Sequence, residues 1–128
     1  MEKHHFKQAE LWLNCAHYCC GLSEEGSEKY NVTVALSIHG IIKANDALSM
    51  KFLNRTARHH DEARELFEQL IKGNKIPAIY ASYKNTLQEA IANKAKAEYR
   101  VAYFSKHDAE EMLRKAEKFM AMVRSIVQ

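Results

Sequence analysis

The sequence predicts an all-α protein, an antiparallel up-and-down helical bundle of four long helices and one short helix. Three observations support this prediction. The 128 residues include one proline and four glycines, so little interrupts a helix. Apolar residues recur at intervals of three and four along nearly the whole chain. The links between these segments are short and polar, which favours antiparallel neighbours in a single domain over residues 1–128.

The first helix is expected at residues 6–22, where apolar side chains form one stripe and Gly21 ends the pattern. That stripe consists of Phe6, Ala9, Leu13, Ala16 and Cys20. A polar, glycine-containing loop follows, and the second helix is expected at residues 32–52 with Asn31 as its N-cap. Its core stripe consists of Val34, Ile38, Ile41, Ile42, Leu48 and Phe52.

A shorter third helix is predicted after the link of residues 54–60, because acidic Asp61 and Glu62 favour the positive end of a helix dipole. Gly73 and Asn74 are expected to end it. Its inward side chains are predicted to be Ala63, Leu66, Phe67, Leu70 and Ile71.

The fourth helix is expected to have Pro77 in its first turn and to run to Ser105. Its stripe consists of Ile79, Tyr80, Tyr83, Leu87, Ala90, Ile91, Lys94, Ala97, Val101 and Phe104. Ser105 and Asp108 have the spacing of a capping box and are predicted to start the fifth helix, which continues to the C-terminus. Its stripe consists of Ala109, Met112, Leu113, Ala116, Phe119, Met120, Val123, Ile126 and Val127.

The composition, with 47% hydrophobic and 27% charged residues, is typical of a globular protein. There is no run of about eighteen apolar residues and no apolar segment of the kind that opens a secretory signal, so we expect a cytoplasmic protein without a membrane span. The three cysteines, Cys15, Cys19 and Cys20, lie too close together to staple distant segments. We interpret them as reduced, buried structural thiols rather than metal ligands.

The chemically distinctive segment is the link between the second and third predicted helices, where Arg55 and His60 are separated by four residues. Metal-free cleavage of RNA needs proton-transfer groups and a cation beside the phosphate. Histidine titrates near neutral pH and arginine binds phosphate through paired hydrogen bonds. Asp46, on the flank of the preceding apolar stripe, is a third candidate. One Arg and one His form a small set, so such a site would gain from two copies facing each other in a homodimer.

The flanking residues also resemble a known family. The run SIHGIIKANDAL, the Arg55 to His60 spacing, the run HHDEARELFEQL, and the segment from Ala92 to Met120 are similar to small prokaryotic members of the HEPN family, named for higher eukaryote and prokaryote nucleotide-binding domains. The resemblance covers most of the chain and implies a HEPN-like helical bundle.

The resemblance implies a function as well. Many members are metal-independent endoribonucleases, often toxins of toxin–antitoxin pairs, with a motif of Arg, four to six residues, then His, joined across a homodimer. It would make Arg55 and His60 catalytic, assisted by Asp46 or Asn45, without a cofactor. The basic junction makes Lys51, Arg58 and His59 candidates for nucleic-acid binding. Partners would be RNA or nucleotide, and a cognate antitoxin or nucleotidyltransferase protein.

Two alternatives remain open. Active members often have Asn, Asp or His directly after the motif Arg, whereas this chain has Thr56, which favours a non-catalytic binding or assembly module. Arg55 and Arg58 would then only neutralise a helix C-terminus, and Asp46 would pair with a lysine. The second and less favoured alternative is a metal-binding bundle that uses His17, His39 and His60.

A last cluster, Lys94, Glu98 and Tyr99, lies in the fourth predicted helix. Lys94 and Glu98 are four residues apart, so a salt bridge along one helix face is expected. The same residues could instead line a pocket. His39, beside Gly40 in an apolar run, is expected to be partly buried and hydrogen-bonded.

Overall fold

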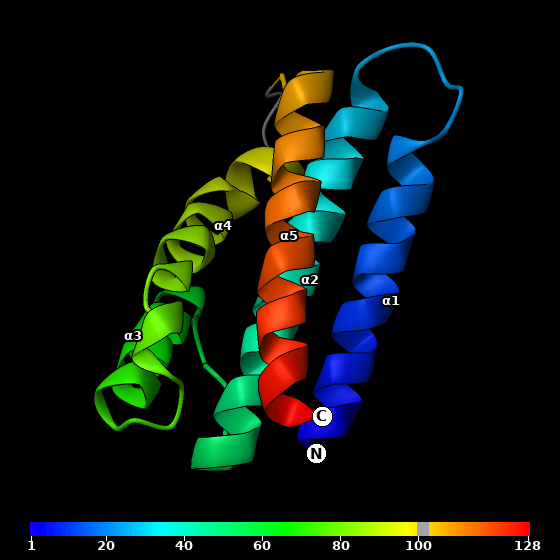
Figure 1. Ribbon diagram of the computed structural model, residues 1–128. Helices are drawn as coiled ribbons and strands as arrows, with labels where there is room; N and C mark the ends of the chain where they lie inside the picture. The colour runs from blue at the N-terminus through cyan, green and yellow to red at the C-terminus, as the bar shows by residue number, and fades with distance from the viewer. Residues whose placement is uncertain (100–102) are drawn as a thin grey trace.

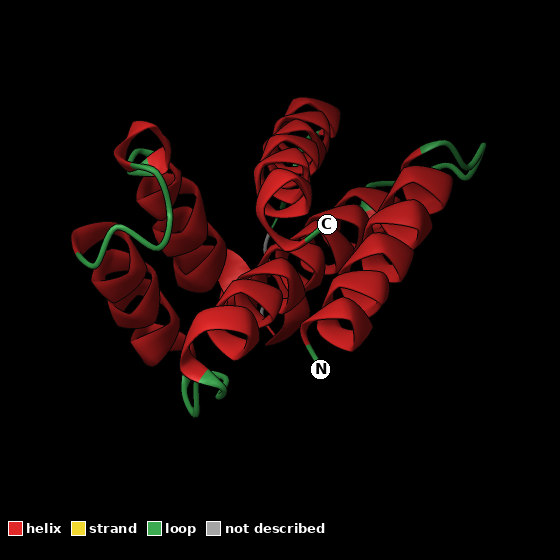
Figure 2. Ribbon diagram, turned by 60° about the horizontal axis from the view of Figure 1, so that its bottom comes forward, coloured by secondary structure: helices red, strands yellow, loops and turns green. Residues whose placement is uncertain are grey.

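The computed structural model describes residues 1–99 and 103–128, and over these ranges the chain is all-α, without a strand (Figures 1 and 2). The helices are α1 (Glu2–Cys20), α2 (Glu28–Leu53), α3 (His60–Lys72), α4 (Tyr83–Tyr99) and α5 (Lys106–Val127), with a 3₁₀ turn, η1 (Ala78–Tyr80), before α4. Four of the helices are long and α3 is short, as the sequence predicted. α1 runs antiparallel to both α2 and α5, α2 and α5 run side by side in the same direction, and the two chain termini lie at the same end of the bundle.

Helix α2 is the central element, because it packs against each of the other four helices of the described part (Figure 1). Its buried apolar side chains are Val34, Ile38, Ile41, Ala44, Ala47 and Leu48. Two buried hydroxyls bond within the helix: Thr33 Oγ1 donates to the carbonyl of Lys29 at 2.7 Å and Ser37 Oγ to that of Thr33 at 2.8 Å. These internal bonds let a helix with polar residues lie in the core.

The contact between α1 and α2 is close at Gly40. A Cβ atom built there would lie 3.6 Å from the carbonyl oxygen of Ala9 and 3.8 Å from the Cβ of Trp12, which are ordinary van der Waals distances. Ala9 itself is fully buried. Small residues on both helices therefore bring the two backbones together, and one extra methyl group would still fit.

Helix α5 begins and ends with specific bonds. The predicted capping box is confirmed: Asp108 N–H donates to Ser105 Oγ at 3.0 Å, and Ser105 N–H donates to Asp108 Oδ2 at 2.9 Å. At the other end, Lys51 of α2 donates to the carbonyl of Ile126 at 2.7 Å. A cation at a helix C-terminus also compensates the helix dipole.

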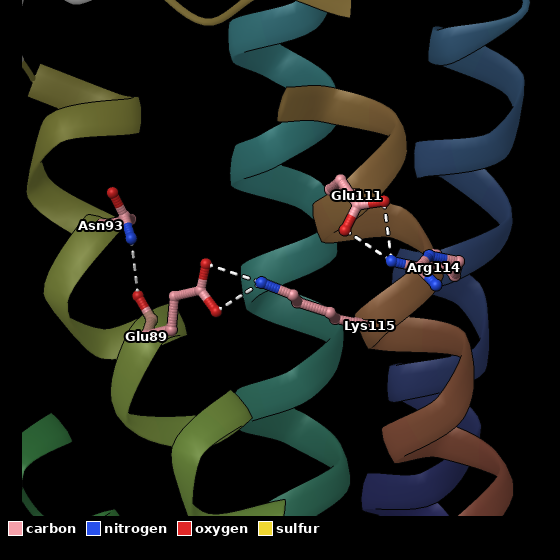
Figure 3. Close-up of polar contacts among 5 residues, drawn as sticks. All are labelled: Glu89, Asn93, Glu111, Arg114 and Lys115. Atoms are coloured by element: carbon pink, nitrogen blue, oxygen red, sulfur yellow. Dashed lines mark hydrogen bonds and ion pairs between the residues drawn. The ribbon is translucent and has the colours of Figure 1, made fainter. Parts of the chain in front are cut away.

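A salt bridge joins α4 to α5 on the side shown in Figure 3, where Lys115 Nζ lies 2.9 and 2.7 Å from the two carboxylate oxygens of Glu89. Asn93 donates to the carbonyl of Glu89 within α4, and Arg114 pairs with Glu111 within α5. Of these contacts, only the Lys115–Glu89 salt bridge links the two helices, and a half-exposed pair of this kind contributes little stability.

Several local predictions were wrong. α2 begins at Glu28, three residues before Asn31, so Asn31 is not its N-cap; its side-chain oxygen instead accepts from the Phe104 N–H at 3.2 Å. Pro77 precedes η1 rather than opening α4, and Ile79 is 82% exposed.

The cysteines also differ from the prediction. Cys19, and not Cys20, belongs to the buried stripe of α1, Cys20 is half-buried, and Cys15 is exposed. Val101, expected in the stripe of the fourth helix, lies outside the described residues. In the described ranges, no helix combines the length and the apolar composition needed to cross a membrane.

Replacing Gly40 with alanine is expected to raise the free energy of unfolding by about 0.5–1 kcal/mol, because alanine is the better helix former and its Cβ fits against α1. Chemical unfolding followed by circular dichroism measures the change. Gly40→Val is the control, since its branched methyl groups would press on the α1 backbone and destabilise the protein. A loss of stability in Gly40→Ala would contradict the packing described for this contact.

Candidate functional site

The link between α2 and α3 displays the Arg–His motif on the surface. α2 ends at Leu53, and its C-cap residue Asn54 adopts a left-handed conformation (φ 54°) and donates its N–H to the carbonyl of Met50 at 3.1 Å. His59 is the extended N-cap residue of α3, and His60 is the first residue of that helix. Arg55, Arg58, His59 and His60 all have exposed side chains. The junction predicted from the sequence is therefore present, and its basic groups reach solvent.

Arg55 has an acidic partner in the first turn of α3. Its Nη1 lies 2.8 Å from Glu62 Oε1, and the arginine side chain is 48% exposed. An ion pair this accessible to water contributes little stability, so the guanidinium can exchange its carboxylate for a phosphate at low cost.

His60 lines a pocket of about 340 Å³ between the start of α3 and the middle of α4. The other lining residues are Asp61, Ile91, Lys94 and Ala95. Partial burial lowers the pKa of His60 first, and the positive charges of Lys94 and His39 lower it further, against the opposing carboxylates of Glu98 and Asp61. These effects favour the neutral imidazole, which is the form that accepts a proton.

Behind this pocket, one polar cluster connects three helices. His39 Nε2 of α2 contacts Glu98 Oε1 of α4, and Lys94 Nζ lies 3.0 Å from the second oxygen of Glu98. On its other side the His39 ring stacks on Trp12 of α1, with 4.8 Å between ring centroids and 24° between planes. Together with His60 at the start of α3, the cluster brings four helices to one place.

The expected Lys94–Glu98 salt bridge is confirmed, and both residues are largely buried. His39 is half-buried and ion-paired, as expected, but its partnership with Glu98 was missed. Helical spacing places His39, Lys43 and Asp46 on one face of α2, at intervals of four and three, but it does not identify Glu98 as the partner. Tyr99 is the last residue of α4, and its side chain lies outside the described part of the structure.

Asp46 is nearly buried on this face of α2, and its side chain is 12% exposed. Its Oδ2 lies 3.8 Å from Lys43 Nζ. Burial raises the pKa of Asp46 to about 6, because loss of water outweighs the nearby lysine charge. The carboxyl therefore titrates close to neutral pH. Arg55, His60 and Asp46 have different immediate partners, and a shared contact among the three stays a prediction.

Asn45, the other helix residue considered for an assisting role, is fully buried and structural. Its Nδ2 donates to the carbonyl of Ala63 in the first turn of α3 at 3.2 Å. Because Ala63 follows His60 by three residues, this bond fixes the start of α3, and thus His60, against α2.

The nucleic-acid candidates lie in two places. Arg58 and His59 lie on the exposed link beside the motif. Lys51 points instead to the C-terminal end of α5, where it donates to Ile126 and lies over the Phe52 ring. The basic groups on the link, rather than Lys51, adjoin the pocket.

The three histidines considered as metal ligands have separate partners. His17 of α1 pairs with Glu117 of α5 at 2.9 Å, His39 pairs with Glu98, and His60 lines the pocket. Over residues 1–99 and 103–128, no group of three or more His, Cys, Asp or Glu side chains is arranged to hold a metal ion.

The fold and the site together define an all-α bundle with a cluster of ionisable side chains where α2, α3 and α4 meet. The chain matches no protein-family model, and no curated protein shows significant similarity to it.

The raised pKa of Asp46 predicts a stability change with pH. Since the folded pKa of about 6 exceeds the ordinary value of 3.8, its stabilising contribution is complete below pH 3.8 and is lost as pH rises through 6. Relative to Asp46→Asn, the wild type should lose about 2–3 kcal/mol of unfolding free energy between pH 4 and 7. Urea unfolding of both proteins across this range measures the difference.

Lys43→Met is the companion variant. Removing the lysine charge raises the pKa of Asp46 further and should steepen the loss of stability with pH. If the difference in unfolding free energy between the wild type and Asp46→Asn does not change with pH, the Asp46 carboxyl is not desolvated.

Proposed function

We propose that this protein is a HEPN-like domain that binds RNA in the cytoplasm and cleaves it without a metal. Arg55 binds the scissile phosphate, His60 moves a proton, and Asp46 assists from α2. The observation that supports this most is the placement of His60, which lies five residues after Arg55 at an exposed helix junction and lines a pocket together with Lys94.

The electrostatics of the junction support proton transfer. The pKa of His60 is lowered and that of Asp46 is raised to about 6, so the two shifts run in opposite directions. Pairs of groups shifted in this manner are typical of acid–base sites. The exposed Arg55 supplies a permanent positive charge that can bind phosphate through two hydrogen bonds.

The order of the helices also supports the family resemblance, since the Arg–His motif immediately precedes a short third helix and follows a long second one. In that family two protomers combine their motifs, and we extend the proposal to a homodimer of this chain. Its cellular partner would be an antitoxin or a nucleotidyltransferase protein.

Removal of the motif side chains should abolish cleavage. We expect His60→Ala and Arg55→Ala each to reduce the rate of cleavage of single-stranded RNA by roughly 10²–10⁴-fold, because each removes a proton-transfer or charge-stabilising group. The rate is measured by gel electrophoresis in the presence of EDTA. His107→Asn, an exposed histidine at the start of α5, is the matched control and should keep wild-type activity.

Wild-type protein that leaves RNA intact under these conditions would instead favour the non-catalytic module. In that case Arg55→Ala would still weaken RNA binding, measured by fluorescence anisotropy of a labelled oligonucleotide, if the junction is a binding surface.

The homodimer predicts a mass in solution twice that of the chain. Light scattering coupled to size-exclusion chromatography measures it over a range of concentrations. A monomer at every concentration tested would rule out a site shared between two copies.

A further inference from the structure

We propose that each chain contributes a second histidine and a lysine to the reaction: His39 is the proton-transfer partner of His60, and Lys94 is the cation beside the phosphate of a single-stranded RNA phosphodiester. Glu98 and Trp12 act as positioning residues for His39. This inference rests on the proposed ribonuclease function and names groups that the Arg55–His60 motif does not contain.

The geometry of the cluster is the first argument. Lys94 lines the same pocket as His60, and Lys94 Nζ lies 3.0 Å from the carboxylate of Glu98. The other oxygen of that carboxylate contacts His39 Nε2. One Lys–Glu pair therefore contacts His39 through its glutamate and shares a pocket with His60 through its lysine.

The second argument is that His39 is held in one orientation from two sides. Trp12 stacks on one face of the ring, and Glu98 contacts its Nε2 edge. A base oriented by a third group is the recurring arrangement of side chains that transfer protons, because the ring need not reorganise during the reaction.

Solvent exposure favours His39 over Asp46 as the proton-transfer partner of His60. The His39 side chain is 31% exposed, whereas that of Asp46 is 12% exposed. Both lie on the same face of α2, but a polymeric substrate can touch the histidine more easily. His39 also belongs to the cluster that acts electrostatically on His60.

The reaction then balances with the groups of one chain. His60, held neutral, takes the proton from the ribose 2′-hydroxyl as its oxygen forms a bond to phosphorus. The bond from phosphorus to the 5′-oxygen breaks, and His39 in its protonated form gives a proton to that oxygen. Lys94 stabilises the negative charge on the non-bridging phosphate oxygens. The products are a 2′,3′-cyclic phosphate and a free 5′-hydroxyl, with no oxidant, reductant or metal required.

The test measures cleavage of the dinucleotide UpA in EDTA by the full-length chain. His39→Gln is the informative variant, because the glutamine amide can still donate to Glu98 but cannot transfer a proton. We expect kcat to fall by about 10²–10³-fold and one limb of the pH profile of kcat to disappear. Lys94→Met is expected to lower kcat by about 10²-fold, with the pH profile retained in shape.

Two matched controls accompany these variants. His17→Asn disrupts another His–Glu pair, with Glu117, and Lys96→Met removes a neighbouring lysine of α4; both should cleave UpA at the wild-type rate. Glu98→Gln tests positioning, and we expect a displaced pH profile together with a fall in kcat of about tenfold. Circular dichroism melts confirm that each variant is folded.

The outcomes separate the two proposals. If the wild type cleaves UpA and His60→Ala does not, but His39→Gln and Lys94→Met cleave normally, this inference is overturned and the proposed function stands. If the wild type does not cleave UpA or longer RNA, both are overturned. If His39→Gln and Lys94→Met lose activity while the two controls keep it, the second histidine and the lysine belong to the site.

Discussion

The requirement that α2 be buried on most of its surface governs this structure. Buried polar side chains on a helix packed by four neighbours need partners within the protein, and Thr33 and Ser37 of α2 find theirs in the helix backbone. Asn45 bonds to a neighbouring helix instead, because its side chain donates to the carbonyl of Ala63 in α3. The bond that gives this buried amide nitrogen its acceptor thus also sets the position of α3.

This constraint also determines where ionisable groups can gather. Faces of α2 covered by α1 and α5 hold small and apolar residues, with Gly40 at the closest approach to α1. His39, Lys43 and Asp46 share another face of α2, where Glu98 of α4 contacts His39 and Trp12 of α1 covers one side of the His39 ring. Loss of water there raises the pKa of Asp46 and lowers that of His60. The electrostatic character of the site follows from the packing of its central helix.

The helices were predictable because apolar spacing and the Ser105–Asp108 capping box are local features of the sequence. Their ends were less predictable: Asn31 has the chemistry of an N-cap, but its oxygen is used by the Phe104 N–H far along the chain. The junction could be predicted because the Arg55 to His60 spacing is also a local feature of the sequence. The His39–Glu98 pair depends on α2 and α4 meeting in space, so no local pattern could reveal it.

The Trp12–His39 stack has a consequence for observing this protein. Trp12 is the single tryptophan of the chain, and its ring lies 4.8 Å from the imidazole of His39. A protonated imidazole in contact with an indole quenches its emission more strongly than a neutral one. The intrinsic fluorescence of the folded protein is thus an optical signal for the charge on one side chain, and it needs no added label.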